Sequence, residues 1–277
     1  MFEIARMDYT QYRKHFFPKQ QDGWDILSCC FASPLPPQRC PARLFIDDNC
    51  RPRSAAVVMG DFVFLSGEPK LSFLKEVAGR DGLLLIARNE GWQEQLPALA
   101  GESFADYKCY PRYRFSLAAK EDQLQQILSS LPEGMRLERI DQSWFEHSRK
   151  VAWMRDFCSQ FACWEDYARW GCGFLLTKEG RPLSGASSYL VSESGFTIQV
   201  QTEDSQQGRG YAKFPSAALI AAALEQGIYP DWDADNEASA RLHSGWATSW
   251  REAMKPFWCS NEFENRRMVD ESFDRGG

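Results

Sequence analysis

The stretch from Gly195 to Ala212, GFTIQVQTEDSQQGRGYA, decides how the second half of this chain is interpreted. Apolar and polar residues alternate at its start, which predicts a strand over 195–202 with one buried face. A glycine-bearing loop comes next, and an alanine-rich segment through Gln226 predicts a helix. The N–H groups at a helix N-terminus form an anion site, and glycines at 208 and 210 let the backbone approach a pyrophosphate without a Cβ in the way.

The loop sequence QGRGYA (207–212) fits a Q/R-x-x-G-x-G/A pattern. Ala212 is small enough for the helix to pack close to the sheet, and Arg209 and Lys213 add positive charge near phosphates. Taken alone the motif is weak, because any strand–helix turn can carry two glycines. A Rossmann nucleotide site is disfavoured because the G-x-G-x-x-G spacing is missing, and the chain has no Walker A loop.

The sequence beyond the helix makes the motif more informative. A short strand is predicted at 228–230, and a helical segment from Asn236 to about Trp246 carries N-x-x-S-x-x-L. Strand, Q-x-x-G-x-A, helix, strand, then N-x-x-S-x-x-L is the order seen in acyl-CoA N-acyltransferases. The chain resembles the GNAT superfamily, specifically the two-domain GNAT acetyltransferase group that includes zwittermicin-resistance-like proteins. The leader 131–141 also resembles the start of that group's C-terminal domain, so the specific motifs cover roughly 131–246.

The resemblance implies that acetyl-CoA is the cofactor. Two parallel strands, about 196–202 and 228–230, would splay apart around the pantetheine arm, and backbone groups near 199–202 would pair with it. An amide there would also stabilise the oxyanion of the tetrahedral intermediate, and the 208–212 amides would hold the pyrophosphate. The residues implied in cofactor binding are Gln201, Thr202, Gln207, Gly208, Arg209, Gly210, Tyr211, Ala212, Lys213, Asn236 and Ser239.

Acyl transfer to an amine needs a neutral amine and a proton for the departing thiolate. The resemblance puts His243 where the family often has a tyrosine, and a histidine can protonate the thiolate because its pKa lies near working pH. The alternative for His243 is a surface position on an amphipathic helix. Glu203, just past the strand end, is the candidate base, with Asp204 as a weaker one. A water-mediated base is the other possibility, because many such enzymes mainly bring the reactants together.

Two departures from the family pattern bear on activity more than on fold. Ala247-Thr248 stands where the family usually has glycine and an aromatic residue, and Pro215 falls inside the expected helix, where it is harmless only in the first turn. The leading hypothesis is an N-acetyltransferase that acts on a primary amine of a small-molecule or peptide-like acceptor in a ternary complex. The alternatives are a non-catalytic acyl-CoA-binding module and an acyltransferase that uses a longer acyl thioester.

An internal match between the two halves predicts a duplication. RPRSAA (51–56) and RPLSGA (181–186) each come after a short apolar strand and a turn, and each precedes strand-like runs. We therefore expect tandem GNAT-like domains of the α/β (α+β) class, each with a mixed central sheet flanked by helices. The expected divisions are a degenerate N-terminal copy at 1–130, the acetyl-CoA-binding domain at 131–265 and a charged tail at 266–277. Two roles are open for the degenerate copy: a wall of the substrate cleft or support for a homodimer.

Periodicity and turn residues predict several further elements. The alternation and apolar runs predict strands at Arg43–Asp47, Ser54–Met59, Phe62–Ser66 and Leu83–Ala87, with Gly60-Asp61 as a hairpin turn. A long helix is expected at Trp153–Trp170, whose tryptophans Trp153, Trp164 and Trp170 fit core or interdomain packing better than a ligand cage.

The composition excludes several other classes of protein. The 277 residues are 44% hydrophobic and 25% charged, as in ordinary soluble proteins, and no apolar run approaches the ~20 residues of a membrane helix. The N-terminus is too charged for a signal peptide, so we expect a cytoplasmic protein without a membrane partner. A net charge of −6 argues against broad nucleic-acid binding. Nine cysteines without a CxxC pair, and only three histidines, lack the usual zinc patterns, so no metal is expected.

Overall fold

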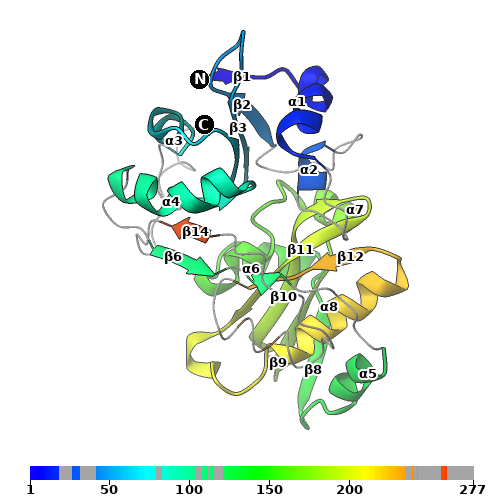
Figure 1. The fold of residues 1–277 in the computed structure, drawn as a ribbon. Coiled ribbons are helices and arrows are strands. Elements are labelled where there is room, and N and C mark those ends of the chain that lie inside the picture. The colour runs from blue at the N-terminus through cyan, green and yellow to red at the C-terminus, as the bar shows by residue number, and fades with distance from the viewer. Residues whose placement is uncertain are drawn as a thin grey trace, which may run out of the picture. The chain divides into compact units, whose positions relative to one another are not determined.

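The computed structural model divides the chain into two compact units, each with its own sheet (Figure 1). The residues that it describes are 1–18, 27–31, 42–78, 83–103, 108–111, 113–114, 121–234, 239, 242 and 257–260. Unit 1 takes Met1–Pro18, Arg43–Pro111 and Lys255–Gly277, and unit 2 takes Lys19–Ala42 and Arg112–Met254. These divisions differ from the expected domains, 1–130 and 131–265, because the chain changes units more than once.

Unit 1 is built on a seven-stranded sheet with the order β1-β2-β3-β4-β5-β14-β6. Its strands are β1 (Phe2–Glu3), β2 (Arg43–Ile46), β3 (Ser54–Met59), β4 (Phe62–Gly67), β5 (Leu84–Ala87), β6 (Lys108–Pro111) and β14 (Phe257–Ser260). Only β4 and β5 are described as a parallel pair, and α3 (Leu71–Val77) lies between them in the chain. Helices α1 (Tyr9–Phe16) and α4 (Glu90–Ser103) also belong to this unit. Gly60, with φ of 58°, turns the chain from β3 into β4 as the sequence predicted.

Strand β14 comes from the far end of the chain and lies inside the sheet of unit 1. Trp258 is opposite Ile86 of β5 on one side and opposite Tyr110 of β6 on the other, and both pairings are antiparallel. Strand β14 was expected to belong to the domain at 131–265, but it is part of the sheet of unit 1. The sequence held no signal for this exchange, because strand pairing across such a distance is set by the tertiary fold.

Unit 2 is built on a five-stranded sheet with the order β12-β11-β10-β9-β8. Its strands are β8 (Met135–Arg139), β9 (Gly173–Lys178), β10 (Arg181–Ser192), β11 (Gly195–Thr202) and β12 (Tyr229–Asp231). Its helices are α2 (Leu27–Phe31), α5 (Glu121–Ser129), α6 (Gln142–Ser148), α7 (Trp164–Trp170) and α8 (Lys213–Glu225). A separate pair joins β7 (Tyr113–Arg114) to β13 (Asp233–Ala234). Among the helices in the described residues, none is long and apolar enough to cross a membrane.

The two units repeat one arrangement. The run β2-β3-β4-α3-β5 in unit 1 has the same order as β9-β10-β11-α8-β12 in unit 2. In both runs the strands that flank the helix are parallel and the others are antiparallel. Ser54 is opposite Gly67 and Ser184 is opposite Thr202, so the two matching sequence motifs begin the same strand of each unit. The chain is a tandem of two related α/β units.

The long helix expected at Trp153–Trp170 is wrong. A 3-10 helix occupies Ala152–Phe157, and α7 begins only at Trp164, after extended backbone at Cys163. Glu165 and Asp166 lie in the first turn of α7, where carboxylates interact favourably with the helix dipole. The aromatic spacing that suggested one helix instead serves core packing from two short ones.

That packing forms an aromatic core rather than a ligand cage. Trp153, Trp164 and Trp170 are half-buried and pack against a buried cluster that includes Phe157 and Tyr167. The Tyr167 hydroxyl lies 2.9 Å from the hydroxyl of Ser187, and burial raises the pKa of Tyr167 well above its ordinary value. Burial also raises the pKa of the neighbouring Cys158 thiol to about 12. Both groups therefore stay neutral at physiological pH and contribute to structure.

Replacing Gly185 in β10 by alanine is expected to destabilise unit 2 by about 1–3 kcal/mol through overpacking. A Cβ there would lie 2.6 Å from the ring of Phe157 and 2.7 Å from Leu175, both of which are buried. The matched control is Gly91→Ala in α4, where a Cβ meets nothing closer than 3.5 Å and helix propensity improves. Chemical denaturation should show a loss for the first variant only. Equal stability of the two variants would contradict the close packing at Gly185.

Candidate active site

The parallel strands β11 and β12 separate before β11 ends. They pair from Gly195 opposite Tyr229 to Thr197 opposite Asp231, where β12 stops. Residues 198–202 of β11 continue beyond this point, half-buried, and no described strand pairs with them on that side. Apart from the Thr202 carbonyl, which accepts from the Gln207 side-chain amide at 3.5 Å, no partner strand within the described residues covers this edge, and an unpaired strand edge can pair with an extended ligand. The resemblance to the GNAT superfamily implied that these two strands splay apart, and their described pairing ends at Thr197.

The loop between β11 and α8 presents backbone N–H groups to the outside. Gly208 and Gly210 have φ of 75° and 72°, a left-handed conformation that glycine adopts without strain, and nothing lies within 4 Å of where a Cβ would stand. Within the described residues, no hydrogen bond is formed by the N–H groups of residues 208–213. Helix α8 begins at Lys213, so its positive dipole end adds to these amides. The arrangement is suited to an anion.

Pro215 does not disturb this site. It is the third residue of α8, between Phe214, whose N–H donates to the carbonyl of Tyr211 at 3.2 Å, and Ser216, whose N–H donates to the carbonyl of Ala212 at 3.3 Å. A proline in the first turn removes an N–H that has no partner in any case. The sequence left two explanations open for Pro215, a late helix start or a kinked site, and α8 begins at Lys213, which places the proline in the first turn.

The side chains expected around the cofactor divide into two groups. Arg209 is exposed, Lys213 lies 4.8 Å above the ring of Phe214, and Tyr211 is half-buried, so all three flank the open amides. Gln207 instead points back into its own loop, where its amide donates to the Asp204 carboxylate at 3.0 Å. Gln207 therefore shapes the loop in this structure.

Three other predicted residues, Gln201, Thr202 and Ser239, lie on β11 or beyond the end of β12. The Thr202 hydroxyl lies 2.8 Å from that of Ser184, which also donates to the carbonyl of Gln201 at 3.1 Å. Ser239 accepts a hydrogen bond from the indole of Trp232 at 3.2 Å, and Trp232 comes directly after β12. Asn236 and His243, together with the 247–248 departure, lie outside the described residues.

Glu203 lies at the stem of the loop. Its Oε1 atom accepts from the Arg181 guanidinium at 2.5 Å, and its Oε2 atom is buried without a hydrogen-bond partner in the described residues. Its backbone N–H donates to the carbonyl of Leu183 at 3.0 Å. Sequence reasoning did not assign Arg181 or Ser184 to this region, although both belong to the RPLSGA motif that marked the duplication.

Comparisons with known proteins agree with this geometry. The family model described as GNAT acetyltransferase matches residues 36–245. The uncharacterized N-acetyltransferase YdfB of Bacillus subtilis is 22% identical over 219 residues, which cover 74% of this chain and 80% of that protein.

Solved structures extend the likeness to almost the whole chain. A crystal structure of a GCN5-related N-acetyltransferase-like protein from Streptococcus suis is 25% identical, covers 92% of this chain and 99% of its own, and has a TM-score of 0.78. A tandem GNAT protein from the clavulanic acid biosynthesis pathway shares the fold, with a TM-score of 0.51 and 11% identity over 93% of this chain and 97% of its own. The chain belongs to the GNAT acetyltransferase family and is an acyltransferase built from tandem GNAT-like units.

Proposed function

We propose that unit 2 binds acetyl-CoA and transfers its acetyl group to a primary amine of a small-molecule or peptide-like acceptor. The observation that carries this proposal is the set of unpaired N–H groups at 208–213, which opens beside the unpaired edge of β11 at 198–202. The first set is suited to a pyrophosphate and the second to an amide-containing arm. These two features match two adjacent parts of coenzyme A, the pyrophosphate and the pantetheine arm.

The residues of this chain have distinct parts in the proposed reaction. The amides at 208–213 hold the pyrophosphate, with Arg209 and Lys213 adding charge, and the edge at 198–202 aligns the arm. Acetyl-CoA supplies a thioester that is activated towards attack by an amine. Holding the two reactants together in a ternary complex accounts for much of the rate enhancement in such a transfer.

The reaction also involves two proton transfers, one to the departing thiolate and one from the attacking amine. His243, which lies outside the described residues, is proposed to protonate the departing thiolate, and Asn236 and Ser239 to support the cofactor arm. For the proton that the amine releases, Glu203 and a water-mediated route were both open from the sequence. The ion pair of Glu203 with Arg181 favours the water-mediated route, because a proton taken up by this carboxylate would break that pair.

The test is a calorimetric titration of the whole protein with acetyl-CoA and with CoA, and then thiol-release assays on a panel of primary amines. Binding of both ligands at one competing site, with release of thiol that depends on the amine, is the expected result. Failure of acetyl-CoA to bind at millimolar concentration would contradict the proposal. A series of acyl-CoA chain lengths separates an acetyltransferase from an enzyme for longer thioesters, since the preferred donor should give the highest kcat/KM.

A further inference from the structure

The stem of the 204–212 loop is fixed by one residue through three contacts. The Glu203 N–H donates to the Leu183 carbonyl at 3.0 Å, the Glu203 carboxylate accepts from Arg181 at 2.5 Å, and the Glu203 carbonyl accepts from the N–H of Gln206 at 2.8 Å. The first two contacts join the end of β11 to the start of β10. The third begins the 3-10 turn Asp204–Gln206 that leads to the two glycines.

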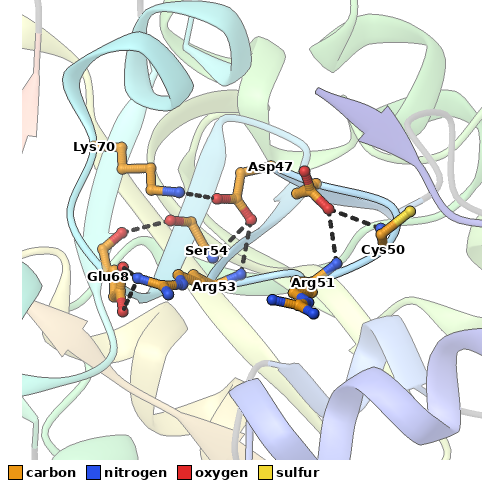
Figure 2. Close-up of polar contacts among 8 residues, drawn as sticks. Asp47, Cys50, Arg51, Arg53, Ser54, Glu68 and Lys70 are labelled. Carbon is orange, nitrogen blue, oxygen red and sulfur yellow. Dashed lines mark hydrogen bonds and ion pairs between the residues drawn. The ribbon is translucent and has the colours of Figure 1, made fainter.

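Unit 1 contains the same arrangement in the corresponding place. Glu68 comes after β4 as Glu203 comes after β11, because Ser54 is opposite Gly67 and Ser184 is opposite Thr202. The Glu68 N–H donates to the Arg53 carbonyl at 2.8 Å, and its carboxylate lies 3.4 Å from the Arg53 guanidinium. Figure 2 shows this pair, together with the bond from the Ser54 hydroxyl to the Glu68 carbonyl.

The segments that come after the two glutamates differ. In unit 1 only Pro69 and Lys70 precede α3, and the Lys70 ammonium pairs with the carboxylate of Asp47, as Figure 2 shows. In unit 2 the residues 204–212 precede α8 and carry the unpaired amides. The arginine–glutamate pair therefore also occurs in the unit that has no glycine-bearing loop.

The two arginines come from different positions in the matching motifs. Arg181 lies three residues before Ser184, whereas Arg53 lies one residue before Ser54. The two positions are two residues apart: Arg53 lies just before β3, whereas Arg181 is the first residue of β10, whose register with β9 shifts between Pro182 and Ser184. The pair is thus retained although the residue that supplies the cation has changed, which is what a structural requirement at the strand end would produce.

We propose that the Arg181–Glu203 ion pair is a positioning element that holds the stem of the 204–212 loop so that the open amides at 208–213 are pre-organised for the diphosphate of an acyl-CoA. The inference rests on the proposed function for its ligand. It assigns Glu203 to loop geometry, where the sequence alone favoured a base. Pre-organisation raises affinity because less ordering remains to be done on binding.

A double-mutant cycle tests the proposal, with the variants Arg181→Met, Glu203→Gln and their combination in the full chain. Each single variant should weaken CoA binding in calorimetry about five-fold, as expected for a partly exposed ion pair, and the double variant should bind no more weakly than either. Hydrogen exchange of the 204–212 amides in the ligand-free protein should be faster in all three. The matched controls are Arg53→Met and Glu68→Gln in unit 1, which should leave the CoA Kd unchanged.

Three outcomes would overturn the inference. If Glu203→Gln keeps the CoA Kd but loses the rising limb of the kcat–pH profile, Glu203 is the base. If only Arg181→Met weakens binding, the arginine contacts the ligand directly. If loop exchange is unchanged in the ligand-free variants, the pair does not hold the loop. That last measurement needs no ligand, so it separates failure of this inference from failure of wild type to bind acetyl-CoA, which would count against the proposed function.

Discussion

Gly210→Glu should abolish acetyl-CoA binding, with a loss on the order of 100-fold or more in Kd, because like charges brought together at an interface cost several kcal/mol. Position 210 lies among the unpaired amides, with open space where its side chain would stand. A glutamate there would put a carboxylate where we place the pyrophosphate, and it would pair with the same amides in the ligand's stead. Calorimetric titration with acetyl-CoA measures the effect.

The control for this variant is Gly134→Glu, in the turn before β8. Gly134 has φ of 76° and also has nothing within 4 Å of a Cβ, so the substitution imposes the same backbone strain and the same charge. It should bind acetyl-CoA as wild type does. Gly210→Ala separates strain from charge, since it keeps the former without the latter, and it should weaken binding far less than glutamate. If Gly210→Glu binds acetyl-CoA normally, the proposal that the 208–213 amides contact the ligand is wrong.

Local patterns in the sequence were enough to predict the elements that surround the site. Strands β3 and β11 begin and end where expected, because the apolar run of β3 and the alternating residues of β11 are each bounded by turn residues. The loop glycines were identified because they let the backbone approach a pyrophosphate, and their left-handed conformation was not predicted. For the helix after them, the sequence left a late start or a kink at Pro215 open, and α8 starts at Lys213 with the proline in its first turn.

Features that depend on tertiary structure could not be predicted. Helix α4 was missed because Gly91, Pro97 and Gly101 interrupt its pattern, although Trp92 and Leu96 are buried in the core of unit 1. The pairing of Arg181 with Glu203 depends on the register of β10 with β11, which no local signal gives. The sequence could therefore predict which residues lie near the site, but not which of their side chains pair with one another.

Deleting residues 255–277 is expected to unfold unit 1 at temperatures where the intact protein is folded. Strand β14 lies between β5 and the edge strand β6, so its removal deletes two antiparallel ladders and separates β6 from the rest of the sheet. Backbone hydrogen bonds contribute about 1 kcal/mol each, and a domain has only about 5–15 kcal/mol in total, so the loss is large relative to the stability of the unit. Hydrogen exchange in β4 and β5 should rise towards that of an unfolded chain.

The matched control is a deletion of 262–277, which keeps β14 and should leave exchange in β4 and β5 at the wild-type level. Comparing the two deletions isolates the strand from the charged residues beyond it. The features that we propose to bind acetyl-CoA lie in unit 2, on β11, the 203–212 loop and α8, so retained CoA binding by the longer deletion would show that unit 2 folds without unit 1. Wild-type protection of β5 in the longer deletion would contradict the strand order, because β5 would then need no partner from the end of the chain.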